Sequence, residues 1–232
     1  TIIEIMGRNA GWLAGSAALA AKYGSGPDLI YLPETPLTLE KIFADVVKLY
    51  EKQGKVLVAV SEGIRDADGN LIASIFTDTT DDKDNFGHRQ MGGLATRLAT
   101  ELKHLTGAKV RGIELSLLQR CAAHLASKTD VDEAVLAGRV AVESAVNGET
   151  GKMVAFERFY AGGEYHCNTK LISLSDVANI EKKVPLEWIN AKHNNVTEDF
   201  INYVEPLIQG WPLRFYEHSL PRYARLKKIL AE

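Results

Sequence analysis

One apolar run limits the fold of this sequence more than any other segment. Residues Lys55–Ser61 read Lys-Val-Leu-Val-Ala-Val-Ser, with almost no alternation between polar and apolar side chains. Such a run is typical of a strand that is buried on both faces, as happens when helices cover a parallel sheet. We therefore expect an α/β protein.

The segments around this run alternate between strand and helix patterns. Strands are predicted over Thr1–Ile5, Asp28–Leu32 and Lys109–Leu115, and helices over Asn9–Lys22, Thr38–Gln53 and Leu94–Leu105. Thr38 is a good N-cap, and Gly54 would end the helix that Thr38 begins. This alternation predicts a three-layer, Rossmann-like fold with a parallel sheet.

The second half of the chain has a different pattern. Asp130 and Glu133 predict a capping box for a helix that ends near Val146. Lys152–Phe159 and Tyr165–Leu174 predict an antiparallel hairpin, with short helices after it and a basic amphipathic helix over Pro221–Glu232.

Composition excludes several classes of protein. The 232 residues carry a net charge of −3, which argues against nucleic-acid binding, and no apolar stretch reaches the roughly 18 residues of a membrane span. We see no signal peptide, and two cysteines, Cys121 and Cys167, make no disulfide framework. We therefore expect a cytoplasmic protein that binds neither nucleic acid nor membrane.

Polar residues gather where ligands of α/β proteins bind, beyond the carboxyl ends of the strands. Gly7 lets a ligand approach the backbone, and Arg8 is expected at a helix N-terminus, where anions are stabilised. Glu62 can accept hydrogen bonds from sugar hydroxyls, while Arg8 and Arg120 can clamp a phosphate. Arg111 begins its strand and can face another surface. The alternative is that these are ordinary solvated or ion-paired side chains.

Other motifs give weaker signals. The glycine-rich turn Gly87–Gly93 can cradle an anion, but a loop that starts a helix is the favoured explanation. Walker A and Gly-x-Gly-x-x-Gly motifs are absent from the sequence, and no residues are predicted to bind a metal. An unrelated dinucleotide enzyme is therefore disfavoured.

Several segments together resemble the 6-phosphofructokinase family. Glu4–Ala14 is similar to its Met-Gly-Arg segment, and the Gly-Trp-Leu-Ala sequence at residues 11–14 resembles the pyrophosphate-dependent branch. Four further segments follow in the family's order: Tyr31–Glu34, Val60–Gly63, Phe86–Gly93 and Leu117–Asp130. The resemblance covers residues 1–160 well and is weaker beyond them.

The resemblance implies roles for individual residues. Met6, Gly7 and Arg8 would contact fructose 6-phosphate, Glu62 would hold its hydroxyls, and Arg120 would bind its 6-phosphate. Arg111 matches a position that reaches across a subunit interface in some members, so a homo-oligomer is expected. Two departures from the family pattern are Leu117, where members often carry Tyr or His, and Met91, in the arginine position of the His88 motif.

The family's Gly-Gly-Asp loop and Thr-Ile-Asp-Asn-Asp segment, which supplies the aspartate base, are not in this sequence. We therefore expect the C-terminal part of a longer enzyme, with no catalytic residue of its own and no activity alone. Its expected domains are 1–119, which binds the sugar phosphate; 120–175, which packs back on the missing N-terminal domain; and 176–232, a helical C-terminal extension.

The parent enzyme would phosphorylate fructose 6-phosphate to fructose 1,6-bisphosphate in glycolysis. The resemblance implies pyrophosphate or ATP as the donor, and Mg²⁺ held mainly by the donor phosphates and the missing half. The alternative from another class is a non-catalytic module that binds sugar phosphates or serves in assembly.

Overall fold

The computed structural model of this chain describes residues 1–76 and 93–230, which form two compact units. The first unit contains residues 1–121 and 175–205, and the second contains residues 122–174 and 206–230 of the described chain. The chain leaves the first unit after residue 121. Residues 175–205 group with the sheet, and the expected division into 1–119, 120–175 and 176–232 stays a prediction.

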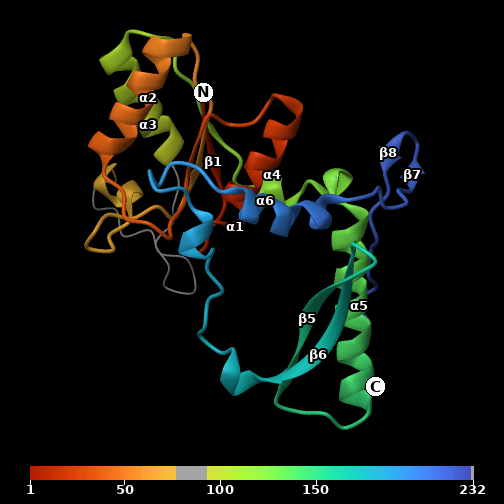
Figure 1. Cartoon of the computed structure of the whole chain (residues 1–232). Helices are drawn as coiled ribbons and strands as arrows, with labels where there is room; N and C mark the ends of the chain where they lie inside the picture. Colours follow the sequence, from red (N-terminus) through yellow and green to blue (C-terminus); the bar gives the residue numbers. More distant parts are fainter. Residues whose placement is uncertain (77–92, 231–232) are drawn as a thin grey trace. The chain divides into compact units, whose positions relative to one another are not determined.

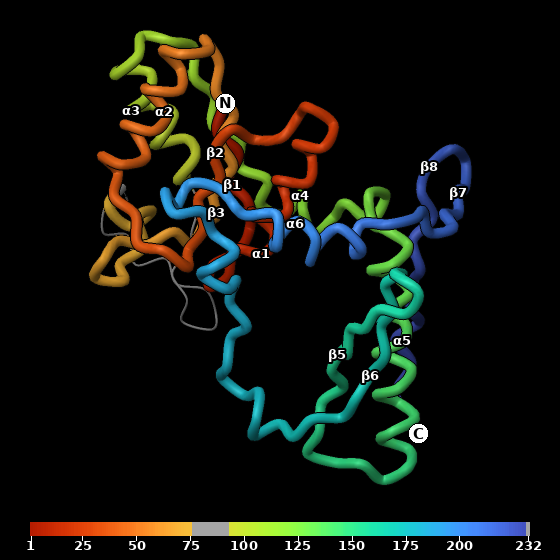
Figure 2. The backbone as a smooth tube through the Cα atoms, in the orientation of Figure 1, coloured from red at the N-terminus to blue at the C-terminus, as the bar shows by residue number. Residues whose placement is uncertain are grey.

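A four-stranded parallel sheet is the centre of the first unit (Figure 2). Its order is β2 (Leu29–Tyr31), β3 (Val58–Ser61), β1 (Ile2–Ile5) and β4 (Gly112–Glu114). Every residue of β3 is buried, which confirms the prediction from the apolar run. In the register, Ile2 of β1 lies opposite the first residues of both β3 and β4, so neighbouring strands end near one edge.

Helices pack against both faces of this sheet, as predicted for a three-layer α/β fold (Figure 1). α2 (Leu39–Gln53) and α3 (Leu94–Thr106) bury one apolar face each against one side. α1 (Trp12–Ser16), the 3₁₀ helix η1 (Ala17–Tyr23) and α6 (Glu198–Val204) contribute to the core on the other side.

The boundaries of α2 agree with the local signals in the sequence. The Thr38 hydroxyl accepts a hydrogen bond from the backbone nitrogen of Lys41 at 3.2 Å, and Gly54 ends the helix in the left-handed conformation. The helix predicted over 9–22 is wrong in its start, because α1 begins only at Trp12 and has five residues before the 3₁₀ turn.

The second unit consists of one long helix and a hairpin. α5 (Lys128–Val146) contacts β5 (Lys152–Ala161) and β6 (Glu164–Ser173), which pair antiparallel through a two-residue glycine turn. The predicted capping box is wrong by three residues. The hydroxyl of Ser127, and not Asp130, accepts the hydrogen bond at the start of α5, from the backbone nitrogen of Asp130.

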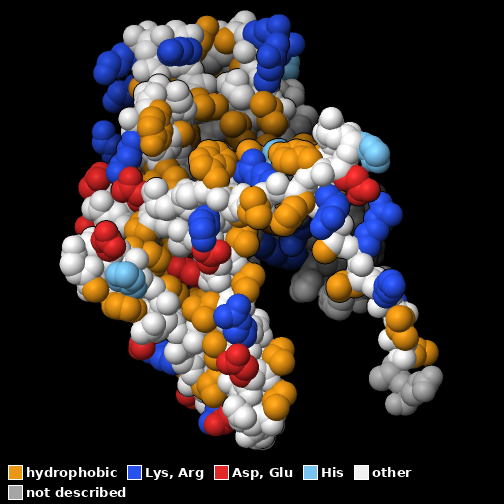
Figure 3. Space-filling view, turned by 90° about the vertical axis from the view of Figure 1, so that its right-hand side faces the viewer, with side chains coloured by type: hydrophobic (Ala, Val, Ile, Leu, Met, Phe, Trp, Pro, Cys, Tyr) orange, Lys and Arg blue, Asp and Glu red, His pale blue; other side chains and the backbone are white. Residues whose placement is uncertain are grey.

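The predicted tail helix is also wrong. β7 (Tyr216–Glu217) and β8 (Leu220–Pro221) form a short hairpin, and residues 222–230 after it adopt no regular structure. Figure 3 shows apolar and basic side chains exposed along this tail. A short helix is stable only when its apolar face packs against something, and Leu226, Ile229 and Leu230 are almost fully exposed.

The remaining elements are short. They are η2 (Ile72–Phe76), α4 (Leu117–Arg120), η3 (Ala123–Leu125), η4 (Leu174–Asp176), η5 (Leu186–Trp188) and η6 (Glu205–Ile208). In the described part of the chain, no helix combines the length and the apolar character that crossing a bilayer requires. Cys121 and Cys167 are not joined in a disulfide.

Candidate functional site

The carboxyl ends of β1 and β3 place two of the predicted segments in contact. Ile5 lies opposite Ser61 in the register, so Met6–Arg8 leaves the sheet beside Glu62. The backbone nitrogen of Gly7 donates a hydrogen bond to Oε1 of Glu62 at 3.1 Å. The Ser61 hydroxyl donates to the carbonyl oxygen of Gly7 at 2.5 Å. Both backbone groups of Gly7 are therefore held by residues at the carboxyl end of β3, Ser61 and Glu62.

Two glycines make this close approach possible. Gly7 has a φ of 154°, and a Cβ atom on it would lie 2.8 Å from the carbonyl oxygen of Ala10. A Cβ atom on Gly63 would lie only 2.0 Å from the carbonyl oxygen of Arg8. The backbone that carries Arg8 therefore packs directly on the turn that carries Glu62.

Gln119, the residue before Arg120, connects the segment of Arg120 to the same edge of the sheet. The side-chain oxygen of Gln119 accepts a hydrogen bond from the backbone nitrogen of Met6 at 2.7 Å. Both Gln119 and Arg120 lie on α4, which follows β4 after a sharp turn in which Ser116 has a φ of 41°. The structure thus brings Met6, Gly7, Glu62 and the segment of Arg120 together.

Arg111 lies at the opposite edge of the sheet. It precedes β4, and its carbonyl oxygen accepts a hydrogen bond from the backbone nitrogen of Ile2, the first residue of β1. Arg8 follows the other end of β1, and a four-residue strand is about 13 Å long. Within one chain, the structure does not bring Arg111 together with the other predicted residues.

The expected helix N-terminus at Arg8 is wrong. α1 begins four residues later, and the backbone nitrogen of Gly11, its N-cap, donates to Oε1 of Glu34 at 2.8 Å. This amide is therefore unavailable to an anion, and a five-residue helix has little dipole to offer.

A buried carboxylate lies within β1 itself. Glu4 is only 6% exposed, and its Oε2 accepts a hydrogen bond from the backbone nitrogen of Ala95 at 2.9 Å, in the first turn of α3. Burial raises the pKa of Glu4, and the nearby carboxylates of Glu114 and Glu62 act in the same direction. We did not predict a role for Glu4, although a single carboxylate in an otherwise apolar strand was a usable signal.

His88, Met91 and most of the glycine-rich turn at 87–93 lie outside the described residues. Among the residues that are described, no three His, Cys, Asp or Glu side chains come close enough to hold a metal ion.

Comparison with known proteins identifies the family. The model of the phosphofructokinase family matches residues 1–123, which is more than half of the chain. The chain belongs to the phosphofructokinase family. All six predicted site residues, Met6, Gly7, Arg8, Glu62, Arg111 and Arg120, lie in this phosphofructokinase segment.

Individual phosphofructokinases are similar over the whole chain. The pyrophosphate--fructose 6-phosphate 1-phosphotransferases of Halomonas elongata and Xanthomonas campestris are 40% and 39% identical to it, over 100% and 98% of its length. The crystal structure of a pyrophosphate-dependent phosphofructokinase from Marinobacter aquaeolei matches all of the chain with a TM-score of 0.81 and 34% identity. The chain spans 54% of each of these two relatives and 53% of that structure, which is about half of their length.

Proposed function

We propose that this chain supplies the fructose 6-phosphate site of a pyrophosphate-dependent phosphofructokinase. The observation that supports this proposal is the contact between Gly7 and Glu62, beside which the Gln119–Met6 hydrogen bond brings the segment of Arg120. Two arginines and a carboxylate at one sheet edge match a sugar phosphate, which has an anionic end and a hydroxyl-bearing end.

In this proposal, each end of the ligand has its own partners. Arg8 and Arg120 would bind the 6-phosphate, because guanidinium groups pair with phosphate through two hydrogen bonds at once. Oε1 of Glu62 is used by the Gly7 amide, and a carboxylate oxygen such as Oε2 accepts hydrogen bonds from hydroxyl groups. The Gly7 contact therefore fixes the carboxylate before the sugar arrives, which lowers the entropic cost of binding.

The whole protein would transfer a phosphoryl group from the donor to the 1-hydroxyl of the sugar. We propose pyrophosphate as the donor, because the similar proteins carry that donor in their names. Mg²⁺ would neutralise the donor phosphates and would be held mainly by groups other than the described residues of this chain. Because this chain holds the acceptor without activating it, we propose that it has no phosphotransferase activity alone.

We further propose that the whole protein is a cytoplasmic homo-oligomer. Arg111 lies at the sheet edge away from the other site residues, where it would serve the sugar-phosphate site of a second copy. This arrangement would explain why an arginine of the predicted set lies so far from the others within one chain.

Isothermal titration of the chain with fructose 6-phosphate tests this proposal. One charge-assisted hydrogen bond contributes about 1.5–3 kcal/mol, so Arg8→Ala and Arg120→Ala should each weaken binding by about 10- to 150-fold. Lys48→Ala, which removes a positive charge from an exposed position on α2, is the matched control. Absence of saturable binding, or equal loss in the control, would overturn the proposal.

A further inference from the structure

One oxygen of Glu34 joins two segments that are distant in the sequence. Glu34 follows β2, and its Oε1 accepts hydrogen bonds from the backbone nitrogens of Gly11 at 2.8 Å and Val184 at 3.0 Å. These partners lie 23 and 150 residues away from Glu34 in the chain. Gly11 ends the loop of residues 7–11 that carries Arg8, so Glu34 links this Arg8 loop to the segment Lys182–Val184.

The other oxygen of Glu34 is enclosed. Oε2 is buried and has no hydrogen-bond partner in the described part of the chain. A Cβ atom on Gly11 would lie 2.8 Å from this oxygen, so the backbone packs against it. A buried polar atom without a partner costs free energy, and an enclosed oxygen cannot contact a ligand in solution. Among the described residues, the carboxylate therefore acts through the two amides that Oε1 holds.

A second contact fastens the same end of the loop. The indole nitrogen of Trp12, the residue after Gly11, donates to the carbonyl oxygen of Lys182 at 2.7 Å. The Trp12 ring also packs against the rings of Trp188, Phe200 and Tyr203, with centroids 5.3–6.2 Å away. The end of the Arg8 loop is thus attached to residues 182–203, while its beginning is attached to Ser61 and Glu62.

We propose that Glu34 is a positioning residue for the sugar-phosphate site, and that the segment Lys182–Val184 contributes to sugar-phosphate affinity without touching the ligand. This inference rests on the proposed function, because Arg8 is the group that the loop presents. Loss of the Oε1 acceptor would leave two buried amides without a partner and release one end of the loop. Arg8 would then have to be ordered at the expense of binding energy.

Two substitutions at position 34 separate positioning from a role of the charge. Glu34→Gln keeps an oxygen acceptor for both amides and removes the charge, whereas Glu34→Ala removes both. For the positioning role we expect fructose 6-phosphate affinity to fall by about tenfold in Glu34→Ala and by no more than about twofold in Glu34→Gln. Glu51→Ala, at an exposed position on α2, is the control and should bind as the wild type does.

Hydrogen exchange without ligand gives an independent readout. The amides of Gly11 and Val184 should exchange faster in Glu34→Ala than in the wild type and Glu34→Gln. Trp12→Phe keeps an aromatic ring but removes the bond to Lys182, and should weaken binding in the same direction as Glu34→Ala. This second variant also serves as the test if Glu34→Ala does not fold.

The outcomes are distinct. Equal losses of affinity in Glu34→Gln and Glu34→Ala would overturn positioning in favour of a role for the charge. Unchanged fructose 6-phosphate affinity and unchanged amide exchange in Glu34→Ala would show that Glu34 does not hold the Arg8 loop to the segment Lys182–Val184. A wild-type chain that binds no fructose 6-phosphate, together with faster Gly11 and Val184 exchange in Glu34→Ala, would reject the proposed function and the effect on affinity while leaving the link in place.

Discussion

The side-chain oxygen of Gln119 lies 2.7 Å from the backbone nitrogen of Met6 and accepts its hydrogen bond, although 113 positions separate the two residues in the sequence. Met6 precedes the glycine and arginine of the Arg8 loop, and Gln119 precedes Arg120. The bond therefore sets the position of one candidate phosphate ligand relative to the other.

Removal of this bond should weaken the sugar-phosphate site without removing a ligand. We expect Gln119→Ala to lower fructose 6-phosphate affinity by about 2- to 12-fold, because a partly buried hydrogen bond contributes about 0.5–1.5 kcal/mol. Gln119→Glu keeps an acceptor for the Met6 amide and is the comparison. Titration calorimetry measures both, and equal affinities in Gln119→Ala and the wild type would contradict the prediction.

Gly63 should tolerate no side chain. A Cβ atom there would lie 2.0 Å from the carbonyl oxygen and 2.5 Å from the carbonyl carbon of Arg8, and backbone atoms cannot rotate away. We expect Gly63→Ala to lower the free energy of unfolding by about 1–3 kcal/mol and to displace Arg8.

Gly138 offers the matched control for this substitution. It lies within α5, and among the described residues no atom outside its own helix backbone and chain neighbours comes within 4 Å of the place where its Cβ would be. Gly138→Ala should therefore raise helix stability by about 0.5–1 kcal/mol. Urea denaturation measures both variants, and a Gly63→Ala variant as stable as the wild type would show that the turn adapts.

Local signals in the sequence predicted most of the first unit. The buried run at Lys55–Ser61, the N-cap at Thr38 and the glycine at 54 each act within a few residues, so their outcome could be read from the sequence. The prediction of a helix over Pro221–Glu232 was wrong, because the apolar side chains Leu226, Ile229 and Leu230 do not pack against the rest of the described chain. The start of α1 failed because a distant carboxylate, Glu34, holds the amide of Gly11.

The candidate site was predictable to the same extent. Glu62 directly follows an apolar strand and Gly7 follows another after one residue, and the topology of a parallel sheet brings such positions together. The contacts of Gln119 and Glu34 could not be predicted, because each side chain accepts a hydrogen bond from a backbone amide far away in the chain. Spacing along the sequence carries no signal for such contacts.

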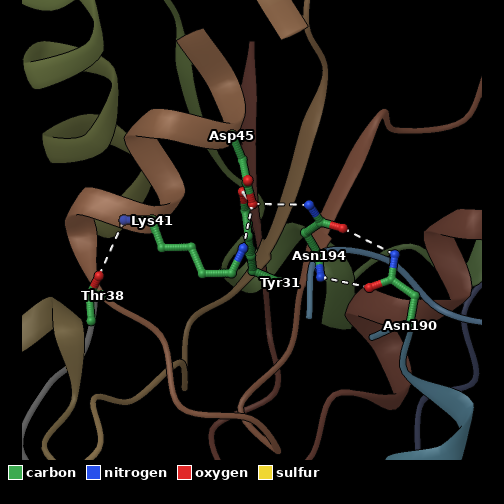
Figure 4. A network of polar contacts seen from close by, with 6 residues as sticks. All are labelled: Tyr31, Thr38, Lys41, Asp45, Asn190 and Asn194. Atoms are coloured by element: carbon green, nitrogen blue, oxygen red, sulfur yellow. Dashed lines mark hydrogen bonds and ion pairs between the residues drawn. The ribbon is translucent and has the colours of Figure 1, made fainter. Parts of the chain in front are cut away.

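A polar network joins α2 to a loop near the end of the first unit (Figure 4). Oδ2 of Asp45 accepts hydrogen bonds from the Tyr31 hydroxyl at 3.1 Å, the Lys41 ammonium at 2.8 Å and the Asn194 amide at 3.0 Å. Tyr31 is fully buried, so Asp45→Ala would leave its hydroxyl without this acceptor. We expect a loss of about 1–3 kcal/mol in the free energy of unfolding.

A double-mutant cycle checks this expectation. Tyr31→Phe removes the buried hydroxyl, so Asp45→Ala should cost less in that background than in the wild type. Equal costs in the two backgrounds would show that the Tyr31–Asp45 bond contributes nothing. Urea denaturation of the four proteins gives the coupling free energy.

The pH dependence of the same carboxylate has a defined sign. Burial acts to raise the pKa of Asp45, but the hydrogen bonds from Lys41, Asn194 and Tyr31 outweigh it, and the pKa is lowered from its usual 3.8. Its contribution to stability is therefore present above pH 3.8 and lost as the pH falls through the lowered value. Asp45→Asn should remove this acid-dependent loss, and an unchanged acid limb of stability against pH would contradict the assignment.

Glu4 should have the opposite dependence. Because burial raises its pKa above the usual 4.5, the folded state favours the protonated form. The resulting stabilisation is fully present below pH 4.5 and is lost as the pH rises through the folded value. Glu4→Gln cannot ionise, yet its amide oxygen can still accept the bond from Ala95.

The free energy of unfolding of Glu4→Gln, relative to the wild type, should therefore rise between pH 4 and pH 7. Urea denaturation across this range measures it, with Glu51→Gln on α2 as the exposed control. A difference that stays constant with pH would show that Glu4 ionises equally easily in the folded and unfolded chain.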